Sequence, residues 1–383
     1  MSPELMTRPR SEVTTMLDVN RAVSDLRRGG FVVIESQGEI ALTQAAEAVT
    51  QDSLALLGRS GLGQPRLALT ANRARVLNFP TSSAAVVLLP LSETVNANTV
   101  RSLVDPTWQL GRQAPMLPKP IALQDAADDS CASAAIRLSK LAEMLPAAIT
   151  TLLGPGSFDR LTSVVANNNL LRVDAEAIAM YPTHSADTLQ PVSRARLPLA
   201  AAENAEIIGF RPADGGADHF AIVIGDPASQ PSALCRLHSE CFTGDILGSM
   251  RCDCGAQLNR ALEIMGKEGH GVLLYLAHEG RGIGLMNKLR AYQLQDAGLD
   301  TVDANVHLGF EPDERSFRVA ANMLRHLGID NVRLMTNNPI KVETLSLEGV
   351  NVVERVRHAM PANPHNQAYL ETKALRSGHM LDR

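Results

Sequence analysis

Gly271-Val-Leu-Leu-Tyr-Leu-Ala-His-Glu-Gly-Arg-Gly-Ile-Gly284 is a continuous apolar run followed by a glycine-rich turn. The apolar run predicts a buried strand over 271–276, and apolar residues at helical spacing predict a helix over 283–297. A strand, a glycine turn and a helix in this order are typical of α/β folds, where such a turn can bind an anion at the helix N-terminus. Arg281 adds a cationic fork to the turn. Taken alone, an ordinary tight connection explains the stretch as well.

The same alternation of elements extends outward on both sides of this stretch. In the second half, strands are expected at 206–210, 219–224, 331–336 and 350–355, and helices at 314–327 and 339–347. In the first half, strands are expected at 30–35 and 84–89, helices at 40–57 and 131–145, and a long Pro- and Asn-rich loop at 96–125. The expected fold class is therefore α/β, mixed with α+β, with a mixed sheet and flanking helices in each domain.

The length of the chain predicts two domains. Its 383 residues are too many for one ordinary core, which stops growing at roughly 250–300 residues. The run Pro182–Pro198 has linker composition, which divides the chain into a domain of residues 1–181, a linker of residues 182–198 and a domain of residues 199–383. Hydrophobic residues at 45% and charged residues at 20% are globular proportions, which argue against a largely disordered chain or a coiled coil.

Charge and cysteine content limit the classes of partner that the chain is expected to bind and the compartment in which we expect it. Up to Arg196 the chain has 18 basic and 18 acidic side chains, whereas the rest has 18 basic and 23 acidic ones, so the second half lacks the basic excess of a nucleic-acid groove. No apolar run approaches the roughly 18–20 residues of a membrane span, and Met1–Arg10 lacks the pattern of a secretory signal. We expect a cytoplasmic protein with no membrane or nucleic-acid partner. Five cysteines, an odd number, favour metal chemistry over a disulfide framework.

The densest reactive segment is Cys235-Arg-Leu-His-Ser-Glu-Cys-Phe-Thr-Gly-Asp-Ile-Leu-Gly-Ser-Met-Arg-Cys-Asp-Cys-Gly255. Cys252 and Cys254 point the same way if their strand is extended, and the turn at 243–245 lets Cys241 fold back toward them. Three thiolates leave one tetrahedral position for water, which is the arrangement of a catalytic zinc. Two alternatives remain open at this point, a structural zinc with a histidine such as His238 as fourth ligand, and simply buried cysteines.

Two further polar segments follow, and all ten histidines lie at or after His184. In the segment 310–315, Asp313 can act as a base and Arg315 can bind phosphate, although an acidic helix start explains the pattern about as well. Lys341 follows an expected strand, so its ammonium group can point to a site at the carboxyl edge of the sheet. Most lysines in such positions are simply exposed to solvent. The reactive side chains therefore concentrate in the second domain.

Six motifs of the second half strongly resemble GTP cyclohydrolase II, the first committed enzyme of riboflavin biosynthesis. They occur in unbroken order between about Ala195 and Leu381. They are His238-Ser-Glu-Cys-x-Thr-Gly-Asp, Arg251-Cys-Asp-Cys-Gly, Glu279-Gly-Arg-Gly-Ile-Gly-Leu, Arg290-Ala-Tyr-x-Leu-Gln-Asp, Leu308-Gly-Phe-x-x-Asp-Glu-Arg and Thr336-Asn-Asn-Pro-x-Lys. One departure is Ile340, where some relatives have a second lysine.

The resemblance implies a reaction and a set of site residues. One zinc per cyclohydrolase domain, bound by Cys241, Cys252 and Cys254, activates the water that attacks C8 of GTP, so that the imidazole ring opens and formate leaves. Arg315 is implied as the nucleophile that takes the nucleotidyl phosphate as pyrophosphate departs, Asp313 as the proton acceptor, and Tyr292 as the residue assisting ring opening. Mg²⁺ accompanies the substrate phosphates, and a homodimer is implied. The implied nucleotide contacts are Arg236, Leu237, His238, Ser239, Glu240, Gln257, Glu279, Gly280, Arg281, Thr301, Thr336 and Lys341.

The first half resembles 3,4-dihydroxy-2-butanone 4-phosphate synthase, the partner domain of bifunctional riboflavin enzymes. The resemblance rests on Val19–Ile34, Gly61–Thr70 and Ala132–Pro146. That family follows its first strand with a dense acidic run that binds Mg²⁺ and needs a later histidine. This chain has Glu35-Ser-Gln-Gly-Glu instead and no histidine before His184. We therefore expect a degenerate, inactive synthase-like domain that serves packing, dimerisation or regulation.

Two alternative functions remain open. The same zinc, water and phosphate contacts serve a related cyclohydrolase acting on a uridine nucleotide in pyrimidine breakdown. A catalytically silent regulatory or binding protein is the second alternative, by analogy with the degenerate first domain.

Overall fold

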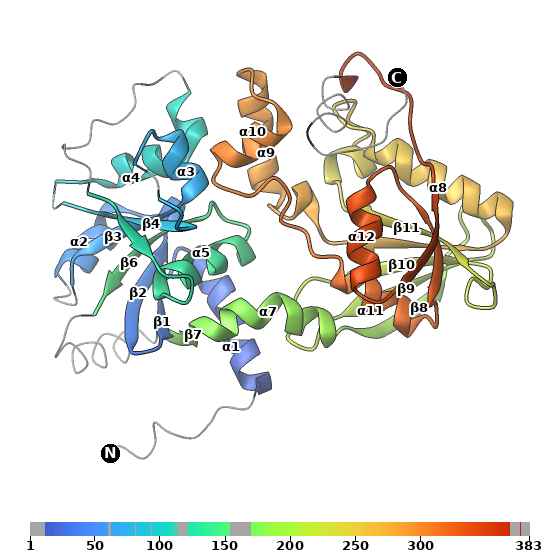
Figure 1. The fold of residues 1–383 in the computed structure, drawn as a ribbon, viewed down its shortest axis with the longest axis horizontal. Helices are drawn as coiled ribbons and strands as arrows, with labels where there is room; N and C mark the ends of the chain where they lie inside the picture. Colours follow the sequence, from blue (N-terminus) through green and yellow to red (C-terminus); the bar gives the residue numbers. More distant parts are fainter. Residues whose placement is uncertain are drawn as a thin grey trace. The chain divides into compact units, whose positions relative to one another are not determined.

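The computed structural model describes residues 12–59, 63–80, 82–92, 94–110, 112, 122–153, 170–367 and 376. The chain divides into two compact units, each with its own sheet and surrounding helices (Figure 1). The first unit comprises Met1–Tyr181 with two later segments, Arg290–Leu294 and Ala304–Pro312. The second comprises Pro182–Leu289, Gln295–Asp303 and Asp313–Arg383. The expected mixed α/β class, with two mixed sheets, is confirmed.

The first unit is built on a seven-stranded sheet in the order β5-β4-β3-β6-β2-β1-β7. Neighbouring strands are antiparallel except β1 and β7, which are parallel. The strands are β1 Val32–Ser36, β2 Glu39–Ala45, β3 Pro65–Thr70, β4 Val86–Pro90, β5 Gln124–Ala126, β6 Ala147–Leu152 and β7 Leu171–Asp174.

Helices cover this sheet and close its core. The helices are α1 Glu12–Arg27, α2 Gln51–Arg59, α3 Ala71–Val76, α4 Ala97–Val104 and α5 Cys131–Leu141, with short 3-10 turns η2 Ala46–Ala48 and η3 Pro106–Gln109. Leu26 of α1, Ile34 of β1 and Leu138 of α5 are fully buried in one cluster. Burial of a side chain of this size contributes roughly 1.5–3 kcal/mol.

Two expectations for the first half are wrong. Residues 40–45 lie in β2, not in a helix, and the helix α2 begins only at Gln51. The pattern of apolar residues suggests a helix, but pairing on both sides with β1 and β6 holds this segment extended. The expected loop at 96–125 contains α4, η3 and β5, while residues 111 and 113–121 lie outside the described residues.

The second unit has a seven-stranded sheet in the order β14-β13-β11-β12-β10-β9-β8. The half from β14 to β12 is parallel and the half from β12 to β8 is antiparallel. The strands are β8 Gln190–Arg196, β9 Ala205–Arg211, β10 His219–Ile224, β11 Ala233–Ser239, β12 Gly271–Leu276, β13 Asn331–Met335 and β14 Asn351–Val356. The carboxyl ends of the parallel strands meet at one edge of the sheet, which is where ligands bind in such folds.

Helices pack on both faces of the second sheet. Leu237 of β11 lies in one cluster with Leu324 of α11 and Leu345 of α12, whereas Leu273 of β12 lies in another with Met265 of α8. Alternate strand residues point to opposite faces, which separates the two clusters. The remaining elements are α7 Ala175–Asp187, α8 Cys254–Glu268, α9 Leu285–Asp296, α10 Thr301–His307, α11 Arg318–His326 and α12 Pro339–Leu347, with a π turn η4 Phe242–Ile246 and a 3-10 turn η5 Glu279–Arg281.

The stretch 182–198, expected to be a linker, is regular structure. Pro182 lies inside α7, and residues 190–196 form β8, paired with β9. Its proline content misled the prediction, because Pro191 lies on an exposed edge strand beside an irregularity in pairing, where proline is tolerated. In the described part of the chain, no helix combines the length and hydropathy that a membrane span requires.

Candidate active site

Three cysteine thiols converge beside the carboxyl end of β11. The Sγ atoms of Cys241, Cys252 and Cys254 all lie within 4.8 Å of one another, and Cys241 and Cys252 are 3.8 Å apart. The geometry differs from the extended strand expected for Cys252 and Cys254, because Cys254 is the first residue of α8. A turn followed by a helix start therefore brings the thiols together. Three soft ligands with this spacing can hold a zinc ion.

Two glycines make this convergence sterically possible. A Cβ on Gly244 would lie 2.8 Å from Cys252 Sγ and 3.0 Å from Cys241 Sγ. A Cβ on Gly255 would lie 2.3 Å from the carbonyl oxygen of Gly244. The distances of 2.8 and 2.3 Å are shorter than real Cβ contacts. The loop can therefore fold onto the cysteines only because these positions lack a side chain.

The thiols differ in their electrostatic surroundings. Hydrogen bonds from Cys252 and Cys254, together with one from Lys288, hold the pKa of Cys241 far below its ordinary value. The adjacent Cys241 sulfur raises the pKa of Cys252. Cys235, by contrast, is buried in the apolar core, and burial raises its pKa to about 12. Cys241 thus ionises more readily than Cys252, and ionisation is what metal binding requires of a thiol.

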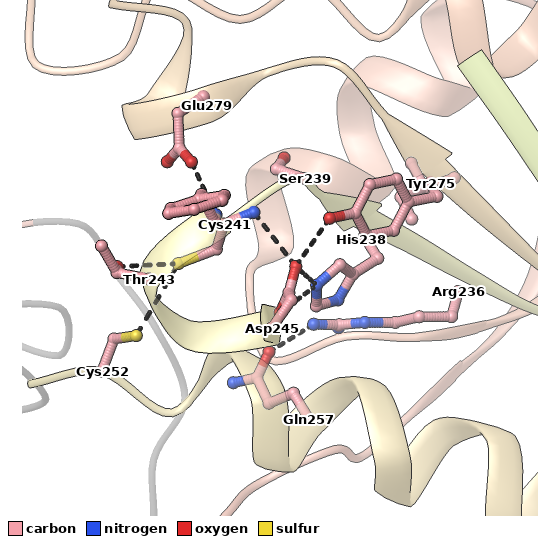
Figure 2. Close-up of polar contacts among 12 residues, drawn as sticks. Arg236, His238, Ser239, Cys241, Thr243, Asp245, Cys252, Gln257, Tyr275 and Glu279 are labelled. Carbon is pink, nitrogen blue, oxygen red and sulfur yellow. Dashed lines mark hydrogen bonds and ion pairs between the residues drawn. The ribbon is translucent and has the colours of Figure 1, made fainter. Parts of the chain in front are cut away.

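A buried carboxylate organises the loop that carries Cys241 (Figure 2). Asp245 accepts the backbone N–H of Cys241 at 3.0 Å and the hydroxyl of Tyr275 at 3.0 Å. It also lies 3.0 Å from His238 Nε2, whose ring stacks on Tyr275. Burial lowers the pKa of His238 despite this carboxylate. Because its Nε2 is directed at Asp245, His238 is absent from the group of converging ligand atoms found among the described residues.

Arg315 and Asp313 form an ion pair that lies next to the end of β11. Arg315 Nε donates to Asp313 Oδ1 at 2.8 Å, and Arg315 Nη1 donates to Ser239 Oγ at 3.1 Å. Burial opposes ionisation of Asp313, but the hydrogen bonds and charge of Arg315 hold its pKa below the usual value. Arg315 Cζ and Lys341 Nζ lie 5.3 and 5.4 Å from the ring centroid of Phe317, so two cations lie close to one aromatic ring.

The glycine-rich turn after β12 packs against the segment that carries this pair. Gly280, Arg281 and Gly282 have φ angles of 62°, 67° and 88°. Arg281 is a non-glycine residue in the left-handed region, which costs roughly 1–2 kcal/mol. Its carbonyl accepts the N–H of Glu314 at 3.1 Å, and a Cβ on Gly282 would lie 3.2 Å from the Glu314 carbonyl carbon. The turn thus holds its strained backbone beside Asp313 and Arg315.

Several predicted nucleotide contacts are buried and bonded within the protein. Arg236 donates to the Met335 carbonyl at 2.8 Å and to Gln257, and burial lowers its pKa to about 10. Lys341 Nζ donates to the carbonyl of Leu237, whose side chain lies in the core. Buried Thr336 accepts the N–H of Asn338. These buried side chains lie beneath the carboxyl ends of the strands.

Comparison with known proteins decides the family. The family model described as GTP cyclohydrolase II matches residues 190–357. The chain is 48% identical over 372 residues, 96% of its length, to a protein named GTP cyclohydrolase-2 from Azospirillum brasilense, of which it covers 94%. The chain belongs to the GTP cyclohydrolase II family. A GTP cyclohydrolase-2 from Enterobacter sp. is 55% identical over 175 residues, which are 46% of this chain and 89% of that protein.

Solved structures of another enzyme are also similar. A two-domain 3,4-dihydroxy-2-butanone 4-phosphate synthase from A. baumannii has a TM-score of 0.37 and 18% identity, covering 89% of this chain and 99% of that one. The corresponding enzyme of Candida albicans has a TM-score of 0.34 and 21% identity, covering 43% and 96%. Because these similarities are low, we infer the chemistry of the first unit only from its own residues.

The structure brings most, but not all, of the predicted site residues to the strand ends of this family member. Arg236, Leu237, His238, Ser239 and Glu240 end β11 or follow it, Glu279–Arg281 follow β12, and Thr336 and Lys341 follow β13. Thr301 begins α10, where its hydroxyl accepts from Gln295 at 3.4 Å. Half-buried Tyr292 lies on α9 in the segment 290–294, which belongs to the first unit.

Three residues of this site were missed by sequence reasoning. Asp245 lies in the turn that was expected to fold Cys241 back, so its position was noted but its carboxylate was not. Lys288 is one of several polar residues on the helix expected at 283–297. Phe317 is one apolar residue in a helix start. No local signal separates any of them from ordinary helix or turn residues.

Proposed function

We propose that the chain opens the imidazole ring of GTP by hydrolysis, with release of formate and pyrophosphate. The product is 2,5-diamino-6-ribosylamino-pyrimidinone 5'-phosphate, an intermediate of riboflavin biosynthesis. The proposal rests on the convergence of three thiols within 4.8 Å at the carboxyl ends of the parallel strands of the second sheet, in a member of this family. Arg315 and Lys341, two cations proposed to contact a nucleotide phosphate, both lie near the ring of Phe317 at this edge.

Zinc fits the three thiols. The site offers only soft ligands, and the lowered pKa of Cys241 supplies the thiolate that zinc requires. When bound, one zinc per chain supplies Lewis acidity that activates water for attack on C8. Mg²⁺ with the substrate phosphates is the second ion of the proposal. It would reconcile an anionic substrate with a mildly acidic domain.

The protein's own residues divide into phosphate and proton roles. Arg315 engages the nucleotidyl phosphate as the proposed nucleophile, and its guanidinium is oriented by Asp313 and Ser239. Asp313, which is ionised beside Arg315, is proposed as the proton acceptor. Tyr292 is proposed to assist ring opening. Buried Arg236, His238 and Thr336, together with half-buried Gln257, are proposed to line the nucleotide site.

We also propose the domain roles expected from the sequence, with 199–383 as the cyclohydrolase domain and 1–181 as an inactive synthase-like domain. β1 and β2 are joined by a two-residue turn, Gln37-Gly38, where an acidic metal-binding run would be needed. Glu35 pairs with Arg172, and Glu39 accepts the N–H of Cys131. Both carboxylates therefore already have partners inside the protein. A homodimer and a cytoplasmic location remain predictions.

A nucleotide panel tests the proposed reaction. Purified, zinc-replete protein with Mg²⁺ is incubated with GTP, ATP, UTP or CTP, and formate and pyrophosphate are quantified by mass spectrometry. We expect both products from GTP alone. If a uridine nucleotide is turned over and GTP is not, the protein is instead a related cyclohydrolase that acts on uridine nucleotides. Absence of turnover with every nucleotide would favour a silent regulatory protein.

A further inference from the structure

A lysine and a glutamate lie against the cysteine cluster and have no part in the chemistry above. Lys288 Nζ is 3.1 Å from Cys241 Sγ and 2.8 Å from Glu279 Oε1. Their side chains are only 11% and 9% exposed. An ammonium group this deeply buried needs anionic partners, and here it has a carboxylate on one side and a thiol sulfur on the other.

Glu279 ties the lysine to the loop that follows Cys241. Its second oxygen, Oε2, accepts the N–H of Phe242 at 2.7 Å (Figure 2), while Oε1 accepts the N–H of Gly280 at 2.8 Å. Glu279 was expected to contact the nucleotide, but both its oxygens are engaged with the protein. Its carboxylate thus connects the turn after β12, the loop after β11 and the first helical turn of α9.

The backbone around this pair is shaped to admit the lysine. Gly280 has a φ of 62°, and a Cβ there would lie 3.1 Å from Lys288 Cβ. The absence of a side chain at Gly280 therefore lets α9 approach the turn closely enough for Lys288 to reach Cys241. Lysine suits this place because its compact ammonium offers three donors, enough to serve a carboxylate and a thiolate together.

Charge gives the arrangement a function. Three thiolates around a divalent ion carry a net charge of about −1, which is costly in a partly buried site. We propose that Lys288, held by Glu279, is a positioning residue of the metal centre that donates a charge-assisted hydrogen bond to the Cys241 thiolate and so stabilises the negative charge at that sulfur. This inference rests on the metal site of the proposed function. Outer-sphere donors of this kind orient a ligand and tune how strongly it donates to its metal.

Metal binding tests this inference without any turnover. Lys288→Met keeps an unbranched side chain that is shorter by one atom, but removes its charge and its donors. We expect the affinity for Zn²⁺, measured by competition with a chromogenic chelator, to fall roughly 10- to 100-fold. In the Co²⁺-substituted protein, the sulfur-to-cobalt charge-transfer band should move to longer wavelength, because the thiolate loses a hydrogen bond. The control Lys267→Met removes the same charge from an exposed position of α8 and should match the wild type.

A second variant covers the case in which Lys288→Met does not fold, as judged by circular dichroism. Glu279→Gln leaves the lysine in place but removes its charged anchor, and it should weaken Zn²⁺ binding and shift the cobalt band in the same directions. Variants that fold and match the wild type in both measurements would overturn the inference. Wild-type protein that fails to bind Zn²⁺ or Co²⁺ at the cysteines would instead contradict the proposed function.

Discussion

Asp245 accepts the backbone N–H of Cys241 at 3.0 Å, so a buried carboxylate fixes the main chain of a candidate metal ligand rather than the metal itself. The same carboxylate contacts His238 and Tyr275, and the side chains of Asp245 and His238 are only 3% and 2% exposed. The loop from β11 to η4 therefore turns around a buried, hydrogen-bonded carboxylate. This carboxylate fixes the main chain at Cys241.

Replacement of Asp245 should destabilise this loop. Asp245→Asn keeps the shape but loses the charge and one acceptor, so we expect a loss of roughly 1–3 kcal/mol in the free energy of unfolding and weaker retention of zinc. Tyr275→Phe removes a single donor and should cost about 1 kcal/mol. Urea unfolding and metal analysis after dialysis measure both effects. An Asp245→Asn protein as stable as the wild type would show that the carboxylate does not organise the loop.

Gly244 should be intolerant of any side chain. In Gly244→Ala, the new methyl group would clash with Cys241 and Cys252, and forced overpacking of this kind costs roughly 1–3 kcal/mol. We expect the purified variant to contain much less than one zinc per chain. Gly58→Ala is the matched control, because a Cβ at Gly58 would meet nothing within 4 Å. Equal zinc contents in the two variants would contradict the geometry of the cluster.

Buried neutral histidines should make the second unit sensitive to acid. Burial lowers the pKa of His219 to about 4 and that of His278 to about 3, the latter with help from His219 and nearby cations. Because these folded-state values lie below the unfolded value of about 6.5, their contribution to stability is fully present above that pH and is lost as pH falls toward 4 and 3.

The number of protons taken up on unfolding reports how many histidines are neutral in the folded protein and protonated in the unfolded chain. In guanidinium at about pH 5, the wild type should take up about one proton more than His219→Asn, whose side-chain oxygen can still accept the N–H of Ala277. At about pH 8 the difference should vanish, because the imidazole is then neutral in both states. Equal uptake by the two proteins near pH 5 would mean that His219 is already protonated in the folded state.

Arg315 should not be replaceable by lysine. Its guanidinium bonds Asp313 and Ser239 at the same time, which a single ammonium cannot reproduce. We expect Arg315→Lys to lower kcat/KM for GTP roughly 100- to 1,000-fold with the fold intact. Arg318→Lys, which alters the nearby exposed pair with Asp187, serves as the control and should remain within about twofold. Near-normal activity of Arg315→Lys would show that the reaction does not require the guanidinium of Arg315.

Sequence reasoning located the elements with strong patterns and missed those set by tertiary pairing. The helix α12 was expected at its observed bounds, because Pro339 marks its start and apolar residues keep its period. The strand β2 was mistaken for part of a helix, since only its neighbours β1 and β6 hold it extended. β8 was mistaken for a linker, because an exposed edge strand has no apolar alternation to reveal it.

The candidate site shows the same division. Cys241, Cys252 and Cys254 could be expected to converge, because the reactive residue type and its spacing are visible in the sequence. The roles of Glu279 and Lys288 could not, since their meaning depends on three separate elements meeting at Cys241. A resemblance identifies which positions matter, whereas the structure distinguishes side chains directed at a ligand from those that hold other side chains.

Isotope tracing from C8 of GTP tests whether the chain opens the imidazole ring. [8-¹³C]GTP is incubated with zinc-replete protein and Mg²⁺ and followed by ¹³C NMR, with Cys252→Ser as the control. We expect the label to appear in formate with the wild type and to stay in the nucleotide with Cys252→Ser. The proposed ring opening at the three-cysteine site would be contradicted if zinc-loaded wild type left the label in the nucleotide, or if Cys252→Ser released as much labelled formate as the wild type.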